Sequence, residues 1–210
     1  LWGIRFNNER SWFLAHKQDY EAHLLAPTRA LGEQVYEALH AAFPKEPFLL
    51  KLSRIYRDAR RLHGNGPYKD HLWFCVRAGG EDWTGRPTFY FEIGPDYYSY
   101  GMGFWAPKAA LMEAYRKAVD EHPEVLEKLV KRFNKQAQFT LSGPEYARKK
   151  TAPSPLLAAW YNKKSINLQH DAAPDERMFS QELAQDIIEG FRTLMPLYKY
   201  FDALCAAEMV

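Results

Sequence analysis

The strongest constraint on the fold is a change of hydrophobic period, from helical spacing near the start of the chain to alternation in its middle. Residues 71–77, 88–93 and 97–104 are short, rich in aromatic side chains and bounded by glycine and proline, as strands are. The last two are separated only by Gly94-Pro95-Asp96, which is short enough for a hairpin. Strands joined by a hairpin are antiparallel. We therefore predict a mainly antiparallel sheet, which also contains residues 48–56.

Helical spacing of apolar residues surrounds these strands. It predicts a helix from about Glu9 to His23, capped by Asn7 or Asn8, and a second helix from Pro27 to Ala42. The later elements follow the same rules: helices from Pro107, from Pro123, over 156–161 and after Ser180, with Pro196 expected to kink or split the last one, and extended segments over 137–141 and 165–169. No repeat or composition break divides the chain, so we predict one α+β domain over residues 1–210.

The composition is that of an ordinary globular protein. Hydrophobic residues make up 47% and charged residues 26%, and 28 Lys+Arg against 26 Asp+Glu give a formal net charge of +2. This balance argues against an overall electrostatic surface for nucleic acid or acidic membranes. No apolar run reaches the roughly 18 residues that cross a bilayer. Cys75 and Cys205 form no C-x-x-C pair, and no signal-peptide core is visible, so we expect free thiols, a cytoplasmic location and no membrane partner.

The densest local charge lies between Lys51 and Asp70, where six Lys/Arg and two Asp give a local net charge of +4. If Leu50, Leu52 and Arg54 share one strand face, Arg54 continues an apolar row and is partly buried. A partly buried guanidinium requires an anion, either a carboxylate of the chain or a bound ligand. Arginine forks suit carboxylate and phosphate oxygens. Two interpretations remain open: a ligand site, with binding residues Arg54, Arg57, Arg60, Tyr68 and Lys69, or a network of structural ion pairs.

The same segment carries a family signature. Arg54-x-x-Arg57-Asp58-x-Arg60, followed by Pro67-Tyr68-Lys69, resembles the R-x-x-R-D-x-R-F and K-x-P-Y-K motifs of the bacterial family called Domain of Unknown Function 2461. The resemblance extends over nearly the whole chain, from Asn7-Asn8 with Trp12-Phe13, through 101–107 with Arg116, to Phe191 and Leu194-Met195-Pro196-Leu197. It implies no reaction, but it makes the arginine cluster the leading site candidate. Two positions depart from the family pattern, because Arg61 replaces its phenylalanine and Asn65 its spacer lysine.

Other motifs are weaker. Gly101-x-Gly103-x-x-Ala106 formally fits a dinucleotide fingerprint, but the bulky Phe104-Trp105 pair fills the positions where the backbone approaches a pyrophosphate, and no βαβ unit surrounds it. We therefore expect no cofactor. The histidines lack metal-ligand spacing, so we expect no metal. We expect the short basic clusters Arg148-Lys149-Lys150 and Lys163-Lys164 to be solvated loop charges.

Two hypotheses of function follow. The first is a soluble protein that binds, or binds and transforms, a small phosphate- or carboxylate-bearing ligand at the arginine-rich site, with Asp58 and Glu92 as candidate acid/base groups. Glu92 and Tyr90 are expected on the sheet face opposite Phe91. The second is a non-enzymatic interaction module, in which the same basic and aromatic surface contacts nucleic acid or an acidic protein. The sequence leaves both the enzyme question and the oligomeric state open.

Overall fold

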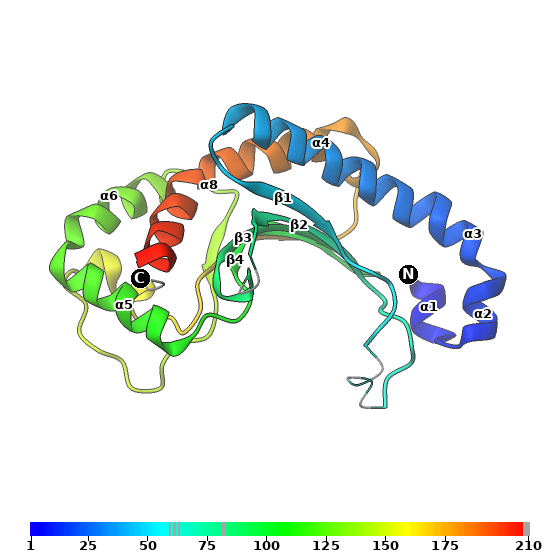
Figure 1. The fold of residues 1–210 in the computed structure, drawn as a ribbon, viewed down its shortest axis with the longest axis horizontal. Helices are drawn as coiled ribbons and strands as arrows, with labels where there is room; N and C mark the ends of the chain where they lie inside the picture. Colours follow the sequence, from blue (N-terminus) through cyan, green and yellow to red (C-terminus); the bar gives the residue numbers. More distant parts are fainter. Residues whose placement is uncertain (59, 61, 63, 81–82, 208–210) are drawn as a thin grey trace. The chain divides into compact units, whose positions relative to one another are not determined.

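In the computed structural model, which describes residues 1–58, 60, 62, 64–80 and 83–207, the strands form one antiparallel sheet (Figure 1). Its order is β1-β2-β3-β4-β6-β5. The strands are β1 (Phe48–Leu52), β2 (Leu72–Ala78), β3 (Pro87–Ile93), β4 (Tyr98–Phe104), β5 (Thr140–Ser142) and β6 (Asn167–Ala172). Strands β1 to β4 lie side by side in the sheet in the same order as along the chain, which is the arrangement that hairpin connections produce. The prediction of an α+β fold with a mainly antiparallel sheet is confirmed.

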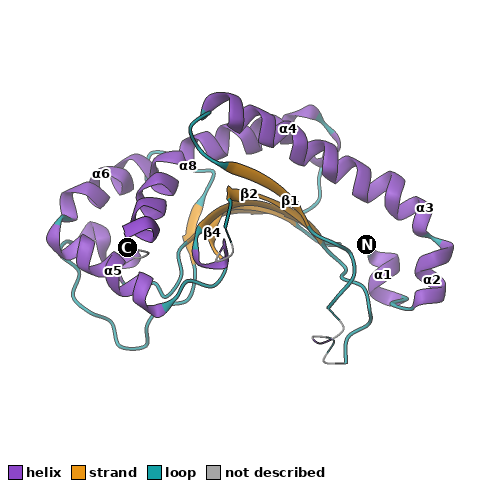
Figure 2. Ribbon diagram, viewed as in Figure 1, coloured by secondary structure: helices purple, strands orange, loops and turns teal. Residues whose placement is uncertain are grey.

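Helices precede, interrupt and follow the sheet (Figure 2). They are α1 (Trp2–Phe6), α2 (Arg10–Ala15), α3 (Lys17–Tyr20), a π-helical turn (Glu21–Leu25), α4 (Ala26–Ala42), α5 (Ala109–Glu121), α6 (Pro123–Phe133), α7 (Ala158–Tyr161) and α8 (Gln181–Ala207). Short 3-10 turns cover Trp83–Gly85, Pro155–Leu157 and Glu176–Phe179. No described helix is both long and apolar enough to cross a membrane.

The chain divides into two compact units that share its longer elements. The first comprises Leu1–Val76, Tyr90–Tyr100 and Asp171–Ile188, and the second comprises Arg77–Phe89, Gly101–His170 and Glu189–Val210. The chain therefore crosses between the units several times, and each unit is built from segments far apart in the sequence. That residues 1–210 form a single domain therefore stays a prediction.

In the first unit, one face of the sheet packs under α4 (Figure 1). Gly32 of α4 lies so close to Phe74 that a Cβ there would be 3.2 Å from the ring, and Phe74 stacks on Phe91 at 5.3 Å. Side chains alternate along a strand, so Trp73 of β2 and Tyr90 of β3 lie on the opposite face. Glu92 shares that face, as predicted. This second face carries most of the polar chemistry described below.

The second unit has an aromatic core between the sheet and α8. Phe89 stacks on Phe191 at 4.8 Å and on Tyr198 at 4.9 Å, and Phe104 meets Phe201 at 5.6 Å. A salt bridge of 2.5 Å between Arg86 and Asp202 lies beside this core. These contacts explain why the closing helix carries its stripe of large apolar residues.

Two local predictions were wrong, and a third was wrong in part. The expected break between two N-terminal helices is absent, because the chain is helical from Lys17 to Ala42 and passes through the π-helical turn Glu21–Leu25 just before Pro27, the residue that cannot donate a helical hydrogen bond. The helix predicted from about Glu9 begins after Glu9 rather than after an asparagine cap, and its first part, α2, ends at Ala15. Of the two outcomes expected at Pro196, the split is absent, because α8 continues through it with Leu194, Met195 and Leu197 buried, and the kink stays a prediction.

Candidate functional site

The family motif lies on an irregular antiparallel ribbon that prolongs the β1–β2 hairpin. Its hydrogen bonds join Ser53 N to Trp73 O, Lys69 N to Ile55 O and Arg57 N to Pro67 O, each at 2.8 Å, and Tyr56 bridges Tyr68. We call residues 53–57 and 67–69 the motif ribbon. The ribbon brings the R-x-x-R segment and the P-Y-K segment together, although the loop between them separates them in the sequence.

The N-terminal helices hold the motif ribbon through Tyr68. The Asn8 amide donates to Tyr68 O and accepts from Tyr68 N, both at 2.9 Å. The Tyr68 ring stacks on Phe13 at 4.1 Å and forms a buried cluster with Ile4, Phe13 and Ile55. Burial raises the pKa of the Tyr68 hydroxyl. These contacts give Tyr68 a structural role in shaping the ribbon.

The predicted partial burial of Arg54 is wrong, because its side chain is exposed. Strand β1 ends at Leu52, and Ser53 then accepts a hydrogen bond from Trp73 N at 3.0 Å. From there Ser53 and Ile55 are buried, while Arg54 and Tyr56 face outward. The alternation therefore changes phase at Ser53, and the apolar row of β1 does not continue through Arg54.

Arg60 pairs with Asp58 on the surface of the loop. Its Nε lies 3.0 Å from Asp58 Oδ1 and its Nη2 lies 2.7 Å from Oδ2, while 87% of the Arg60 side chain is exposed. Arg60 thus pairs with a carboxylate of its own motif. Asn65 donates to Leu62 O at 3.0 Å within the same loop, and Arg61 lies outside the described residues.

Lys69 is the most constrained cation of the motif. Its side chain is half-buried, and its Nζ lies 5.7 Å from the centre of the Trp73 ring. Burial lowers the pKa of the Lys69 ammonium, Arg54 and Arg57 lower it further, and Glu92 opposes them. Within the described part of the chain, no carboxylate forms an ion pair with Lys69. Lys69 is thus influenced most by Glu92 among its charged neighbours, and then by Arg54 and Arg57.

Arg57 belongs to this group of cations and also makes a hydrogen bond within the motif ribbon. Its Nε donates to Tyr68 O at 2.9 Å, the same carbonyl that accepts from Asn8. The hydrogen bond fixes the orientation of the guanidinium but uses only one of its donors. The remaining donors of Arg57 make no hydrogen bond to the described residues.

Glu92 and Tyr97 form a hydrogen-bonded pair at the end of the β3–β4 hairpin. The Tyr97 hydroxyl donates to Glu92 Oε1. Burial and this hydrogen bond both raise the pKa of Tyr97, so its hydroxyl stays protonated. On the same face, the Tyr90 hydroxyl lies 3.2 Å from Ser99 Oγ, and burial raises the pKa of Tyr90 to about 12. Glu92 is thus a carboxylate with a bound proton donor, close enough to Lys69 to influence its ionisation.

The sequence did not reveal a second ion-pair group, centred on Arg5 of α1. Arg5 Nε lies 2.7 Å from Asp70 and its Nη1 lies 2.6 Å from Asp96. Although burial acts in the opposite direction, the hydrogen bonds from Arg5 and His71 lower the pKa of the Asp70 carboxyl. These partners are 65 and 91 positions apart in the chain, so no local spacing could have linked them.

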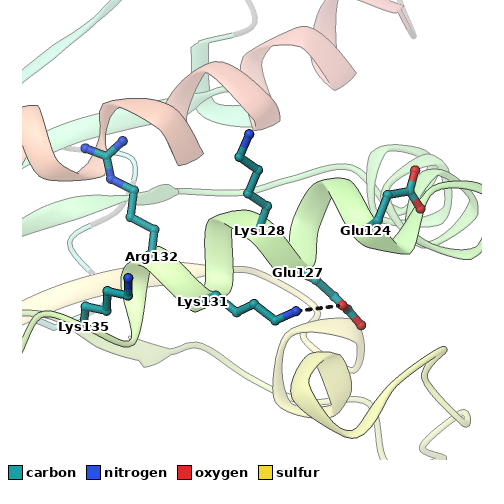
Figure 3. Close-up of a pocket in the computed structure, with 6 residues that line it drawn as sticks. All are labelled: Glu124, Glu127, Lys128, Lys131, Arg132 and Lys135. Atoms are coloured by element: carbon teal, nitrogen blue, oxygen red, sulfur yellow. Dashed lines mark hydrogen bonds and ion pairs between the residues drawn. The ribbon is translucent and has the colours of Figure 1, made fainter.

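A separate hollow of about 400 Å³ lies on the second unit, along α6 (Figure 3). It is lined by Glu124, Glu127, Lys128, Lys131, Arg132 and Lys135. Figure 3 shows Lys131 reaching Glu127, 3.4 Å away, while Lys128 and Arg132 extend from another side of the helix. The opposite side of α6 is buried through Leu126, Val130 and Phe133, so this charged side is the outer face of an amphipathic helix.

Among the described residues, no group of three or more His, Cys, Asp or Glu side chains is placed to hold a metal ion.

Of the sequence-predicted site residues, the structure brings Arg54, Arg57, Lys69 and Glu92 into one neighbourhood. It leaves Asp58 and Arg60 paired with each other on the loop.

Comparison with known proteins agrees with the resemblance in the motifs. No curated protein matches the chain. The model of a family described as "Conserved hypothetical protein (DUF2461)" matches residues 1–200 of the 210. The motif ribbon and the helices that hold it therefore lie within the matched region, and the chain belongs to the DUF2461 family.

Proposed function

We propose that this protein binds a small ligand bearing a phosphate or carboxylate group at Arg54, Arg57 and Lys69. The observation that supports this most is the half-buried Lys69 ammonium, which has two arginines near it and no ion-paired carboxylate among the described residues. Withdrawing a cation from water without a partner is costly. A bound oxyanion removes that cost, and the free donors of Arg57 suit its oxygens.

The remaining motif residues contribute less to such a site. Asp58 already neutralises Arg60, and the Arg60 side chain extends into solvent. Tyr68 supports the ribbon from the core side. The proposed site therefore consists of the three cations Arg54, Arg57 and Lys69, with Trp73 beside Lys69 as an apolar wall.

Glu92 is better placed than Asp58 to act as an acid or base toward a bound ligand. It lies near Lys69, and its Oε1 accepts a hydrogen bond from the Tyr97 hydroxyl. A general acid or base must be held within hydrogen-bond reach of the proton that it moves, and this hydrogen bond holds the Glu92 carboxylate in place. If the ligand is transformed, we propose that Glu92 carries the proton and that Tyr97 positions the Glu92 carboxylate.

Thermal-shift measurements against a panel of phosphate- and carboxylate-bearing metabolites test the proposal. A ligand present at about 100 times its Kd adds about 2.7 kcal/mol of stability, and a chain of this size gains about 2–4 °C per kcal/mol. We expect Lys69→Met to abolish this rise. Lys51→Met is the matched control, since Lys51 is an exposed residue of β1 and should leave the response intact.

Arg57→Ala supplies a second variant for the same experiment. Tyr68 O keeps its hydrogen bond from Asn8, and no carboxylate is stranded, so the ligand-free protein should lose only about 1 kcal/mol. The ligand response should nevertheless disappear. A loss of several kcal/mol without any ligand response in the wild type would instead assign Arg57 to the scaffold alone.

The interaction-module hypothesis keeps one observation in its favour. Tyr56 is 52% exposed, although its ring also contacts Phe13 and Tyr68, and Arg54 two positions before it is exposed as well. Such a pair suits stacking and phosphate contacts with a single-stranded nucleic acid. Binding to polynucleotides would then be insensitive to sequence and would weaken steeply with salt, because counterions are released. Strong, salt-steep polynucleotide binding without any metabolite response would overturn the small-ligand proposal.

The pH dependence of ligand binding should follow Lys69. Its folded-state pKa lies below the ordinary value of 10.5, so the ammonium loses its proton earlier than an exposed lysine does. Anion affinity should therefore be constant at neutral pH and should fall as the pH rises through that lowered pKa. Titration calorimetry at increasing pH measures this fall, and Lys69→Arg should move it to higher pH because a guanidinium stays charged. A fall at the same pH in both proteins would exclude Lys69 as its cause.

A further inference from the structure

The second unit contains a buried cation that the proposed function does not use. Arg116 of α5 is only 9% exposed, and its Nη1 is buried without a hydrogen-bond partner. Within the described part of the chain, no carboxylate forms an ion pair with it. Buried guanidinium groups are normally paired, because desolvating the charge is costly. An unpaired buried donor on such a group therefore points to a missing acceptor.

The surroundings of Arg116 bring a second cation close by. Its Cζ lies 4.8 Å from the centre of the Tyr146 ring, and the Nζ of the exposed Lys164 lies 5.7 Å from the same centre. Asp120 follows Arg116 by one helical turn, but its oxygen accepts a hydrogen bond from the Tyr161 hydroxyl at 3.0 Å. One aromatic ring thus contacts two cations, and among the described residues neither cation donates a hydrogen bond to the Tyr146 hydroxyl.

The backbone at Tyr146 and just before it is held in place. Tyr146 N donates to Asn162 O at 3.0 Å, and Lys164 N donates to Pro144 O at 2.7 Å. Lys163, expected from the sequence to be a solvated loop charge, is instead buried and donates to Gly143 O and Glu145. With the backbone held in this way, rotation about the side-chain bonds is the direct route by which the half-buried Tyr146 ring leaves Arg116.

We propose that Arg116 and Lys164 form a second oxyanion-binding site, specific for a phosphate or carboxylate group, which the Tyr146 ring covers when no ligand is bound. When the ring rotates outward, the oxyanion supplies the acceptor that Arg116 Nη1 lacks, and Lys164 adds a second charge from the solvent side. While no oxyanion is bound, the cation–π contact with Tyr146 offsets part of the cost of desolvating the Arg116 guanidinium. This site is independent of the motif ribbon and of the function proposed there.

Inorganic phosphate titrated into Lys69→Met, with chloride at equal ionic strength as reference, tests the proposal without contribution from the first site. A covered site binds with an affinity reduced by the open fraction, so Tyr146→Ala should bind phosphate about tenfold more tightly if the open state is about 10% populated. Tyr146→Phe, which keeps the ring, should bind like its parent. Phosphorus NMR line widths and thermal shifts both report the binding.

Arg116→Met in the Tyr146→Ala background should remove phosphate binding, and Lys164→Met should weaken it. Arg132→Met, on the exposed side of α6, is the matched control and should have no effect. Lys164 is exposed, so its variant remains informative if Arg116→Met does not fold. Equal phosphate affinity with and without the Tyr146 ring, or binding that survives both Arg116→Met and Lys164→Met, would overturn the proposal.

Discussion

Gly101→Ala is expected to destabilise the protein by about 3 kcal/mol, because an added methyl group would collide with a neighbouring strand. A Cβ at Gly101 would lie 2.0 Å from Leu168 O and 3.0 Å from Gln169 Cα. Both are backbone atoms of β6, so the clash is relieved only by separating β4 from β6. At about 2–4 °C per kcal/mol, the melting temperature should fall by several degrees or more in a calorimetric scan.

Gly64→Ala is the control for this substitution. Gly64 has a φ of +83°, but no atom lies within 4 Å of the position of its Cβ. It should therefore cost only the roughly 1–2 kcal/mol that a left-handed backbone imposes on a side chain. A Gly101→Ala protein as stable as the Gly64→Ala protein would show that β4 and β6 do not approach so closely.

The same clash explains a pattern in the sequence. Gly103 is in a similar position, since its Cβ would lie 2.0 Å from Asn167 Oδ1. The spacing that formally fits a dinucleotide fingerprint therefore serves the close approach of β6 to β4. The glycines are needed by the sheet, whatever ligand the protein binds.

Asn8→Asp should have the second largest effect, about 2 kcal/mol at neutral pH, because it replaces a hydrogen-bond donor with a carboxylate oxygen that faces Tyr68 O. The Asn8 amide now satisfies both backbone groups of Tyr68, at 2.9 Å each. The variant keeps the bond from Tyr68 N and loses the other. Urea unfolding measures the loss, and Asn7→Asp, at an exposed neighbour bonded to Gly3 O, should cost only a few tenths of a kcal/mol.

The pH dependence of that variant gives a further check. A protonated carboxyl can again donate to Tyr68 O, so folding favours the neutral form and raises the pKa of the introduced group. The folded state then binds more protons than the unfolded state above the ordinary carboxyl pKa. The deficit relative to the wild type should therefore shrink as the pH falls through the raised pKa. A deficit independent of pH would mean that Asn8 acts through shape rather than through its hydrogen bonds.

The candidate site was only partly predictable from the sequence. The motif identified Arg57 and Lys69, and the alternation of β3 placed Glu92 opposite Phe91, because a strand has a fixed period of two. The same argument failed for Arg54, since the register with Trp73 changes the alternation at Ser53. No period within one segment reports a hydrogen bond made to another segment.

The sequence by itself determined the α+β class, the antiparallel order of the central strands and the family, because these follow from local period, turn residues and motif spacing. Only the tertiary structure decided which polar and charged groups are paired. Asn8 meets Tyr68 across 60 residues, Arg5 meets Asp96 across 91, and Arg116 is buried with an unpaired donor. Burial and pairing depend on which distant segments pack together, and that packing is settled by the whole core rather than by neighbours in the chain.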